Sequence, residues 1–214
     1  MPPPKRTAEM EERERRERER REFKEAQELE SLRRAFKRID KSGDGHIDVN
    51  ELLNEMKFLG YSLKEREASL WIWEVDDDAD GQVDWEEFRT LFFRVRDDQT
   101  GLEPRKFFNV IEFVMFDKNS SGSIDLDECM SLLYGRYGKA IVEEVSTELG
   151  PDEGAAEKMV SFTRFVNLQY AASKKIKKAA GGDDEMDPLK KGCSSIPQVK
   201  PIGMLIDPKA AHLI

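Results

Sequence analysis

Seven carboxylates fall within the twelve residues DDDADGQVDWEE, which begin at Asp76 and end at Glu87. Like charges at this spacing repel by about 1 kcal/mol per neighbouring pair even in bulk water, and a bound cation would offset that repulsion. The acids alternate, Gly81 supplies a residue that tolerates positive φ, and a glutamate ends the segment. This is the order in which a loop offers oxygens to calcium. The predicted ligands are Asp76, Asp78, Asp80, Gln82 through its carbonyl, Asp84 and Glu87.

The same pattern occurs in two further segments. The segment DKSGDGHIDVNE begins thirty-six residues before Asp76 and offers Asp40, Ser42, Asp44, His46 through its carbonyl, Asp48 and Glu51. The segment DKNSSGSIDLDE offers Asp117, Asn119, Ser121, Ser123, Asp125 and Glu128, with Gly122 at the turn. Acidic ligands number four in the first loop, five in the second and three in the third. Calcium affinity tends to decrease as the number of charged ligands decreases, so the third loop is predicted to bind calcium most weakly.

Helices must hold these loops in place, and apolar residues recur at helical spacing beside each of them. They include Leu29, Leu32, Phe36 and Ile39 before the first loop, and Phe107, Val110, Phe113 and Phe116 before the third. From about Leu29 to Tyr170 the chain resembles the EF-hand superfamily and is similar in layout to calmodulin and troponin C. The resemblance implies an all-α fold with two EF-hand pairs. It also implies that the residues at loop position 8 join paired loops through short strands, and these are Ile47, Val83, Ile124 and Val160.

Val160 belongs to a fourth hand that follows the third at the same spacing, in the window EGAAEKMVSFTR. This window has lost the chemistry of the other three. Position 6 is Lys158 instead of glycine, and position 12 is Arg164, a cation where the closing carboxylate should be. We expect no calcium there and a distorted incoming helix, because Gly150 and Pro151 interrupt it. The hand is expected to cover the apolar face of the third.

The predicted organisation has five parts. They are a charged helical arm (1–27), an N-terminal hand pair (28–97), a linker (98–104), a C-terminal hand pair (105–172) and an extended tail (173–214). Pairs one turn apart support the arm helix: Glu11 with Arg15, Glu12 with Arg16, Glu14 with Arg18, and Glu17 with Arg21. The arm has no apolar stripe between Glu11 and Glu22, so it is expected to project into solvent and continue into the first hand.

The tail carries eight lysines and five acids, a net charge of +3 beside an acidic body. Its prolines forbid long helices, and its short apolar segments suit either simple disorder or docking on a partner. Lysines 174, 175, 177 and 178 offer a weaker case for acidic lipid, because no continuous apolar face accompanies them.

Composition excludes several classes. A net charge of −9 and a pI near 5.0 argue against a nucleic-acid binder. No apolar run of about 18 residues and no signal peptide are present, so a cytoplasmic protein is expected, with membrane binding disfavoured. Cys129 is interpreted as a core thiol rather than a redox switch, and Cys193 as an exposed thiol. His46 and His212 lack the neighbours of a catalytic site, and calcium accounts for the acids, so an enzyme is not expected.

Two functions remain open. One is a calcium-responsive adaptor or regulatory subunit that binds one dedicated protein partner, with up to three Ca²⁺ ions and Mg²⁺ as an alternative occupant at rest. The other is a constitutive component of a cytoskeletal assembly, as in the axoneme of a cilium or flagellum, in which arm and tail dock and calcium modulates. The second rests on analogy with cytoskeletal accessory proteins, with the arm interpreted as a helix that lies along a charged partner surface. A calcium buffer is disfavoured because it needs neither extension.

Overall fold

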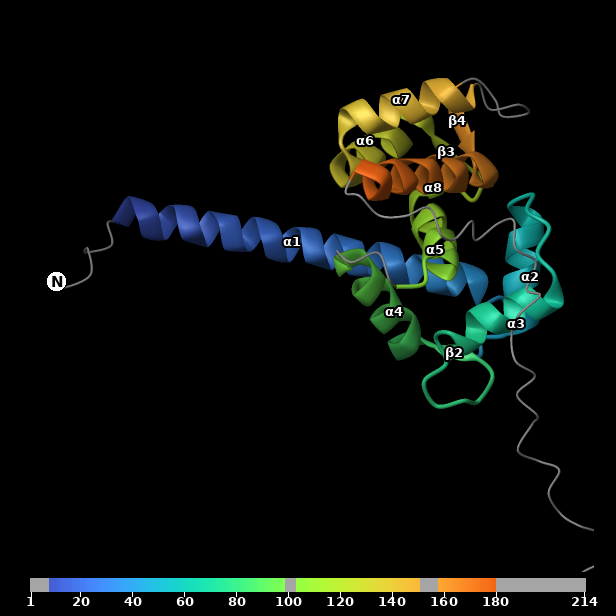
Figure 1. Cartoon of the computed structure of the whole chain (residues 1–214). Helices are drawn as coiled ribbons and strands as arrows, with labels where there is room; N and C mark the ends of the chain where they lie inside the picture. Colours follow the sequence, from blue (N-terminus) through green and yellow to red (C-terminus); the bar gives the residue numbers. More distant parts are fainter. Residues whose placement is uncertain (1–7, 99–102, 151–157, 180–214) are drawn as a thin grey trace, which may run out of the picture. The chain divides into compact units, whose positions relative to one another are not determined.

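The computed structural model describes residues 8–98, 103–150 and 158–179 of the 214-residue chain (Figure 1). Within them the fold is helical, as the sequence predicts. The helices are α1 (Ala8–Ile39), α2 (Val49–Phe58), α3 (Glu65–Trp73), α4 (Trp85–Asp97), α5 (Lys106–Phe116), α6 (Leu126–Tyr137), α7 (Lys139–Leu149) and α8 (Phe162–Ala179). The strands are β1 (His46–Ile47), β2 (Val83–Asp84), β3 (Ser123–Asp125) and β4 (Met159–Ser161). Residues 173–179, predicted as the start of an extended tail, belong instead to α8. The predictions for the tail beyond residue 179, including that for Cys193, lie outside the described residues.

The four strands join the loops in pairs. β1 lies antiparallel to β2 with Ile47 opposite Val83, and β3 lies antiparallel to β4 with Ile124 opposite Val160. All four side chains are at most 1% exposed. The predicted pairing through position 8 is therefore confirmed, and it includes the fourth hand, which was located only by counting.

Loop residues also cap three of the outgoing helices. Asp125 is the N-cap of α6 and accepts from the N–H groups of Asp127 and Glu128. Asp48 and Asp84 are the N-caps of α2 and α4, and each accepts a bond from the backbone N–H of the glutamate three residues later. Glu51 and Glu87 in turn accept from the N–H of the capping aspartate, which completes a capping box at each helix. A carboxylate in the first helical turn also interacts favourably with the helix dipole. The same residues thus start the helix and fix the closing carboxylate of the loop.

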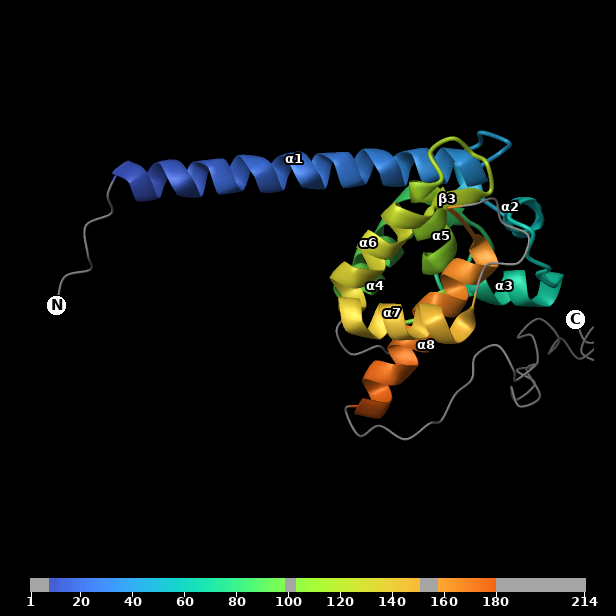
Figure 2. The same cartoon turned by 90° about the horizontal axis from the view of Figure 1, so that it is seen from above.

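One hydrophobic core runs through both hand pairs. The Phe88 ring meets that of Phe107 edge to face at 6.0 Å, and the Phe92 ring stacks on that of Phe108 at 5.4 Å. Helix α5 supplies the last two of these rings, and Figures 1 and 2 show it against the C-terminal half of α1. Eight of its eleven residues are buried. A helix that is apolar on nearly all sides belongs in a core, so α5 is covered both by its own hand pair and by α1 and α4.

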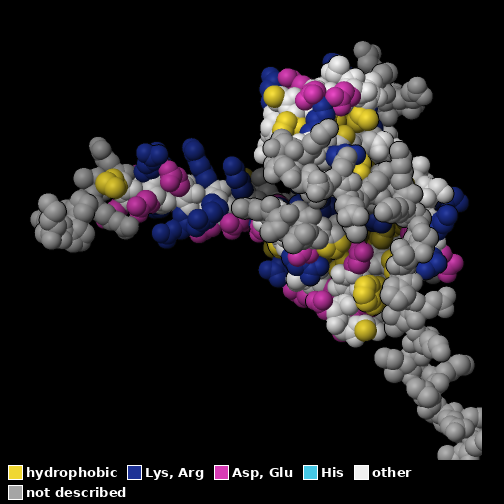
Figure 3. All heavy atoms as spheres, viewed as in Figure 1, with side chains coloured by type: hydrophobic (Ala, Val, Ile, Leu, Met, Phe, Trp, Pro, Cys, Tyr) yellow, Lys and Arg dark blue, Asp and Glu magenta, His cyan; other side chains and the backbone are white. Residues whose placement is uncertain are grey.

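Helix α1 runs without interruption for 32 residues, which carries the charged arm into the first hand as predicted. Residues 13–27 are all exposed, and Figure 3 shows basic and acidic side chains interspersed along this part of the helix. The predicted pair of Glu12 with Arg16 forms at 2.8 Å, and Arg13 pairs with Glu17 at 2.9 Å. Exposed pairs of this kind contribute only about 0.2–0.5 kcal/mol each to the helix. None of the helices in the described residues is long and apolar enough to cross a membrane.

Candidate metal centre

The second loop gathers carboxylates around one point. Oxygens of Asp76, Asp78 and Asp80 all lie within 4.8 Å of one another. Two oxygens bound to one calcium ion at about 2.3–2.6 Å can be at most about 5 Å apart, so this spacing fits the ion. Backbone N–H groups hold the carboxylates in place: Asp76 accepts from Gly81 at 2.8 Å, and Asp80 accepts from Gln82 at 2.8 Å. Gly81 has φ +84°, as its position at the turn requires.

The closing glutamate of this loop folds back over it. Glu87 accepts from the N–H of Asp77 through Oε1 at 2.7 Å and from the N–H of Asp84 through Oε2 at 2.9 Å. These bonds tie the end of the loop to its beginning. A bidentate closing carboxylate is what calcium needs from this position.

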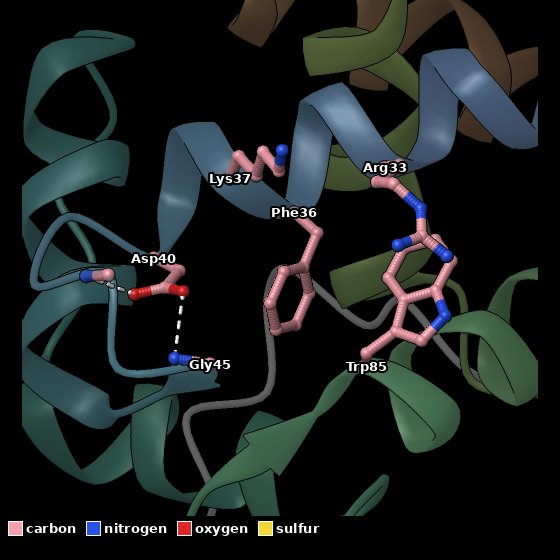
Figure 4. Close-up of a pocket in the computed structure, with 7 residues that line it drawn as sticks. Arg33, Phe36, Lys37, Asp40, Gly45 and Trp85 are labelled. Carbon is pink, nitrogen blue, oxygen red and sulfur yellow. Dashed lines mark hydrogen bonds between the residues drawn. The ribbon is translucent and has the colours of Figure 1, made fainter.

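The first loop has the same construction in a more buried setting. Asp40 accepts from the N–H of Gly43 at 2.7 Å and from that of Gly45 at 3.1 Å, as drawn in Figure 4. Glu51, only 8% exposed, accepts from the N–H of Ser42 at 2.8 Å and from that of Asp48 at 3.2 Å. The loop is thus closed at both ends by its own carboxylates.

The third loop differs from the first two at its closing residue. Asp117 still accepts from the N–H of Ser121 and Gly122, each at 2.8 Å. Its closing residue, Glu128, is exposed, and its carboxylate lies 3.6 Å from the Lys118 amine. The Ser121 hydroxyl lies 3.2 Å from the Asp117 carboxylate and 2.9 Å from the Ser123 carbonyl, so these three predicted ligands are joined to one another.

Comparison with known proteins agrees with this geometry. A family model described as an EF-hand domain pair matches residues 29–93, and one described as an EF hand matches residues 110–133. The chain is 30% identical over 144 residues to the probable calcium-binding protein CML27 of Arabidopsis thaliana, 80% of which it covers. The chain belongs to the EF-hand family of calcium-binding proteins.

Two further EF-hand relatives match shorter stretches. Identity is 36% over 101 residues with troponin C of Todarodes pacificus and 38% over 109 residues with calcium-binding protein 7 of Homo sapiens. The chain covers 65% of the first and 50% of the second. Membership of this family agrees with the expectations of a calmodulin-like and troponin C-like protein that binds Ca²⁺ and is not an enzyme.

The fourth EF-hand keeps its framework. Lys158 stands at position 6 with φ +66°, the conformation that the three glycines adopt in the other loops. Arg164 donates to the carbonyl of Ser146 at 3.1 Å, which directs the position-12 cation to α7. Helix α7 ends at Leu149, and Gly150 at its C-cap has φ +71°. In these residues the hand therefore retains its strand and its turn, while residues 151–157 lie outside the described part of the chain.

Sequence reasoning missed a group of charged residues beside the EF-hand loops. Arg38, two residues before the first loop, donates to the Asp117 carboxylate of the third loop at 2.9 Å and to its backbone carbonyl at 3.1 Å. Glu55, fully buried on α2, accepts from Arg38 Nε at 2.8 Å. A signal was present: Glu55 falls between Leu52 and Met56 on an apolar face, and a buried acid requires a cation partner.

Aromatic residues flank the first EF-hand loop as well. A pocket of about 490 Å³ lies between the end of α1 and the start of α4 and is lined by Arg33, Phe36, Lys37, Asp40, Gly43, Gly45 and Trp85. Figure 4 shows the Arg33 guanidinium over the Trp85 indole, 4.6 Å from the ring centre. This contact joins Trp85, which belongs to the second loop, to α1, the helix that leads into the first loop.

The interpretation of Cys129 as a core residue is confirmed. Its side chain is 1% exposed. Burial, together with the Glu112 carboxylate, raises the pKa of the thiol to about 12. The thiolate that metal binding or redox chemistry requires is therefore not formed near neutral pH.

Proposed function

We propose that this protein is a calcium-responsive adaptor or regulatory subunit with one dedicated protein partner. The observation that carries the proposal is the construction of the first two loops, in which Asp40 with Glu51 and Asp76 with Glu87 are already held by backbone N–H bonds. Preformed ligands bind an ion with less ordering cost than a loop that must fold around it. The relatives include a troponin C and two calcium-binding proteins, which supports the same class.

We assign the ions to three loops and give them an order. The second loop, with five acidic ligands, is the strongest candidate, followed by the first and then the third. The outward position of Glu128 supports placing the third last, because its carboxylate must reorient before it can bind an ion. Mg²⁺ prefers the same oxygens, so it is an alternative occupant at rest.

The arm is the element that we assign to the partner. Its side chains between residues 13 and 27 are exposed and strongly charged, which suits a complementary charged surface. Phe92, Phe107 and Phe108 are buried against the chain's own helices, so their rings are not free to contact a partner. Exposed apolar side chains remain at Phe58 and Trp73 on the N-terminal pair.

A second candidate function is a constitutive component of a cytoskeletal assembly, with cilia and flagella as examples. The same arm favours it, because a long charged helix without an apolar stripe can lie along a charged filament surface in any calcium state. The two functions differ in what chelation does. A regulatory subunit should change or lose its contacts without calcium, and an assembly component should stay bound.

Calcium titration in millimolar magnesium tests the proposal. Calorimetry counts the sites, and tryptophan fluorescence on the same sample reports the conformation through Trp71, Trp73 and Trp85. We expect three sites with dissociation constants of about 10⁻⁷–10⁻⁵ M and a change in fluorescence. Absence of calcium binding within this range of dissociation constants would reject the regulatory proposal. Sedimentation with the isolated partner assembly, with and without chelator, then separates the two functions.

A further inference from the structure

The guanidinium of an arginine from another part of the chain contacts the third loop. Arg38, on the last turn of α1, directs Nη1 at the Asp117 carboxylate at 2.9 Å and at the Asp117 carbonyl at 3.1 Å. The Arg38 side chain is 10% exposed and that of Asp117 fully buried. Asp117 is the predicted first ligand of that loop, so the guanidinium contacts, through Oδ2, the same carboxylate that an ion would use.

Buried contacts hold Arg38 in this position. Its Nε and Nη2 lie 2.8 and 2.7 Å from the same oxygen of Glu55, which is fully buried on α2. Its guanidinium also lies over the Phe58 ring at 5.4 Å. That ring reaches the turn of the third loop, where a Cβ added to Gly122 would lie 3.5 Å from it. The first hand thus contacts the third loop at both the first ligand and the turn.

We propose that Arg38 is an internal competitor for the cation at the third loop, and that it links calcium binding there to the contact between the two hand pairs. The inference rests on the proposed third site. A calcium ion on Asp117 would face the guanidinium at close range, and two cations on one buried carboxylate repel strongly. Binding of the ion therefore requires Arg38 to move away.

Linkage then works in both directions. If calcium at the third loop weakens the bond from Arg38, an intact bond weakens calcium by the same factor. Arg34, one turn earlier, contacts the same region by donating to the Met115 carbonyl at 3.0 Å, but it does not reach the loop carboxylate. Substituting each arginine in turn therefore distinguishes charge competition from the simple loss of an interhelical contact.

The test compares wild type with Arg38→Met and, as the matched control, Arg34→Met. Two-dimensional NMR of ¹⁵N-labelled full-length protein follows Gly45, Gly81 and Gly122, whose N–H groups donate to the first aspartate of each loop. Each amide reports its own loop during one calcium titration. In Arg38→Met we expect the affinity at Gly122 to rise about tenfold, with the other two loops constant within about twofold. In Arg34→Met the affinity at Gly122 should stay near that of wild type.

The outcomes are distinct. An unchanged or weaker affinity at Gly122 in Arg38→Met would overturn the competition, as would an equal gain in Arg34→Met. If calcium shifts the amide resonances of Gly45 and Gly81 but does not shift that of Gly122 in any variant, the third site is absent. The proposed function then has one calcium ion fewer. Should Arg38→Met fold poorly because Glu55 is left buried without its partner, the double variant Arg38→Met with Glu55→Met carries the same expectation.

Discussion

The N-terminal and C-terminal hand pairs share a loop spacing and differ in what their carboxylates contact. In the first two loops Glu51 and Glu87 bond to backbone N–H groups of their own loop. In the third, Glu128 lies beside Lys118, while Asp117 receives a guanidinium from a distant helix. The motif alone therefore does not determine how ready a loop is to bind. We propose that neighbouring cations also decide whether its oxygens are available.

The largest expected effect concerns the core that the two pairs share. Phe108→Ala should lower the free energy of unfolding by about 3–5 kcal/mol, because it removes a fully buried ring that stacks on Phe92 and leaves a cavity in its place. Urea denaturation followed by circular dichroism measures the change. Since the core is continuous, one cooperative transition should shift as a whole.

The control for this variant is Phe23→Ala, whose ring on the arm is 64% exposed. It should change the stability by less than about 0.5 kcal/mol. Two separate transitions, with only the later part of the chain destabilised by Phe108→Ala, would show that the hand pairs fold independently.

The next effect concerns calcium binding at the second loop, whose ligands are already held by backbone N–H groups. Glu87→Gln should weaken calcium at the second loop by about 100-fold, because the loop loses its bidentate charge. Glu86→Gln is the matched control, since it removes the same charge from an exposed residue that pairs with Arg89 at 3.0 Å. Calorimetry should count one site fewer only in the first variant. Three sites of unchanged affinity in Glu87→Gln would mean that the ligand assignment is wrong.

A smaller effect is expected in the fourth hand. Lys158 has φ +66°, a conformation that costs a residue with a Cβ about 1–2 kcal/mol. Lys158→Gly should stabilise the protein by about 0.5 kcal/mol, because the greater freedom of glycine in the unfolded chain offsets part of the gain. Thermal unfolding measures it, and Lys158→Ala should give no gain. Equal stabilisation by alanine would place the effect elsewhere than in the backbone.

The last and most local effect concerns the arm. Glu12 pairs with Arg15 at 2.7 Å and with Arg16 at 2.8 Å. Glu12→Gln should weaken the local helix by about 0.2–0.5 kcal/mol per pair, visible as a small loss of helical signal at low salt. High salt screens exposed charges, so the difference from wild type should vanish there. A difference that persists in high salt would contradict an ionic origin.

The loops and their pairing were predictable because both depend on residues at fixed spacing. Ligand types recur at fixed positions in a loop, the spacing of the hands locates Val160, and the resemblance to EF-hand proteins implies that it pairs with Ile124. The contact between hand pairs was not predictable in this way. Helical spacing shows that α5 has apolar faces, but it does not show which helix covers each one. Arg38 was missed for the same reason, since 79 residues separate it from Asp117.

Helix α1 joins the end of the arm to Arg38 without a break. At a rise of about 1.5 Å per residue, its 32 residues span about 48 Å. No proline or glycine interrupts the stretch from Ala8 to Ile39 that could absorb a bend. A tilt of roughly 10° about the last turns of α1 therefore displaces the opposite end by roughly 8 Å. A small tilt of α1 at its last turn, where Arg38 contacts the third loop, is thus amplified at the far end of the arm.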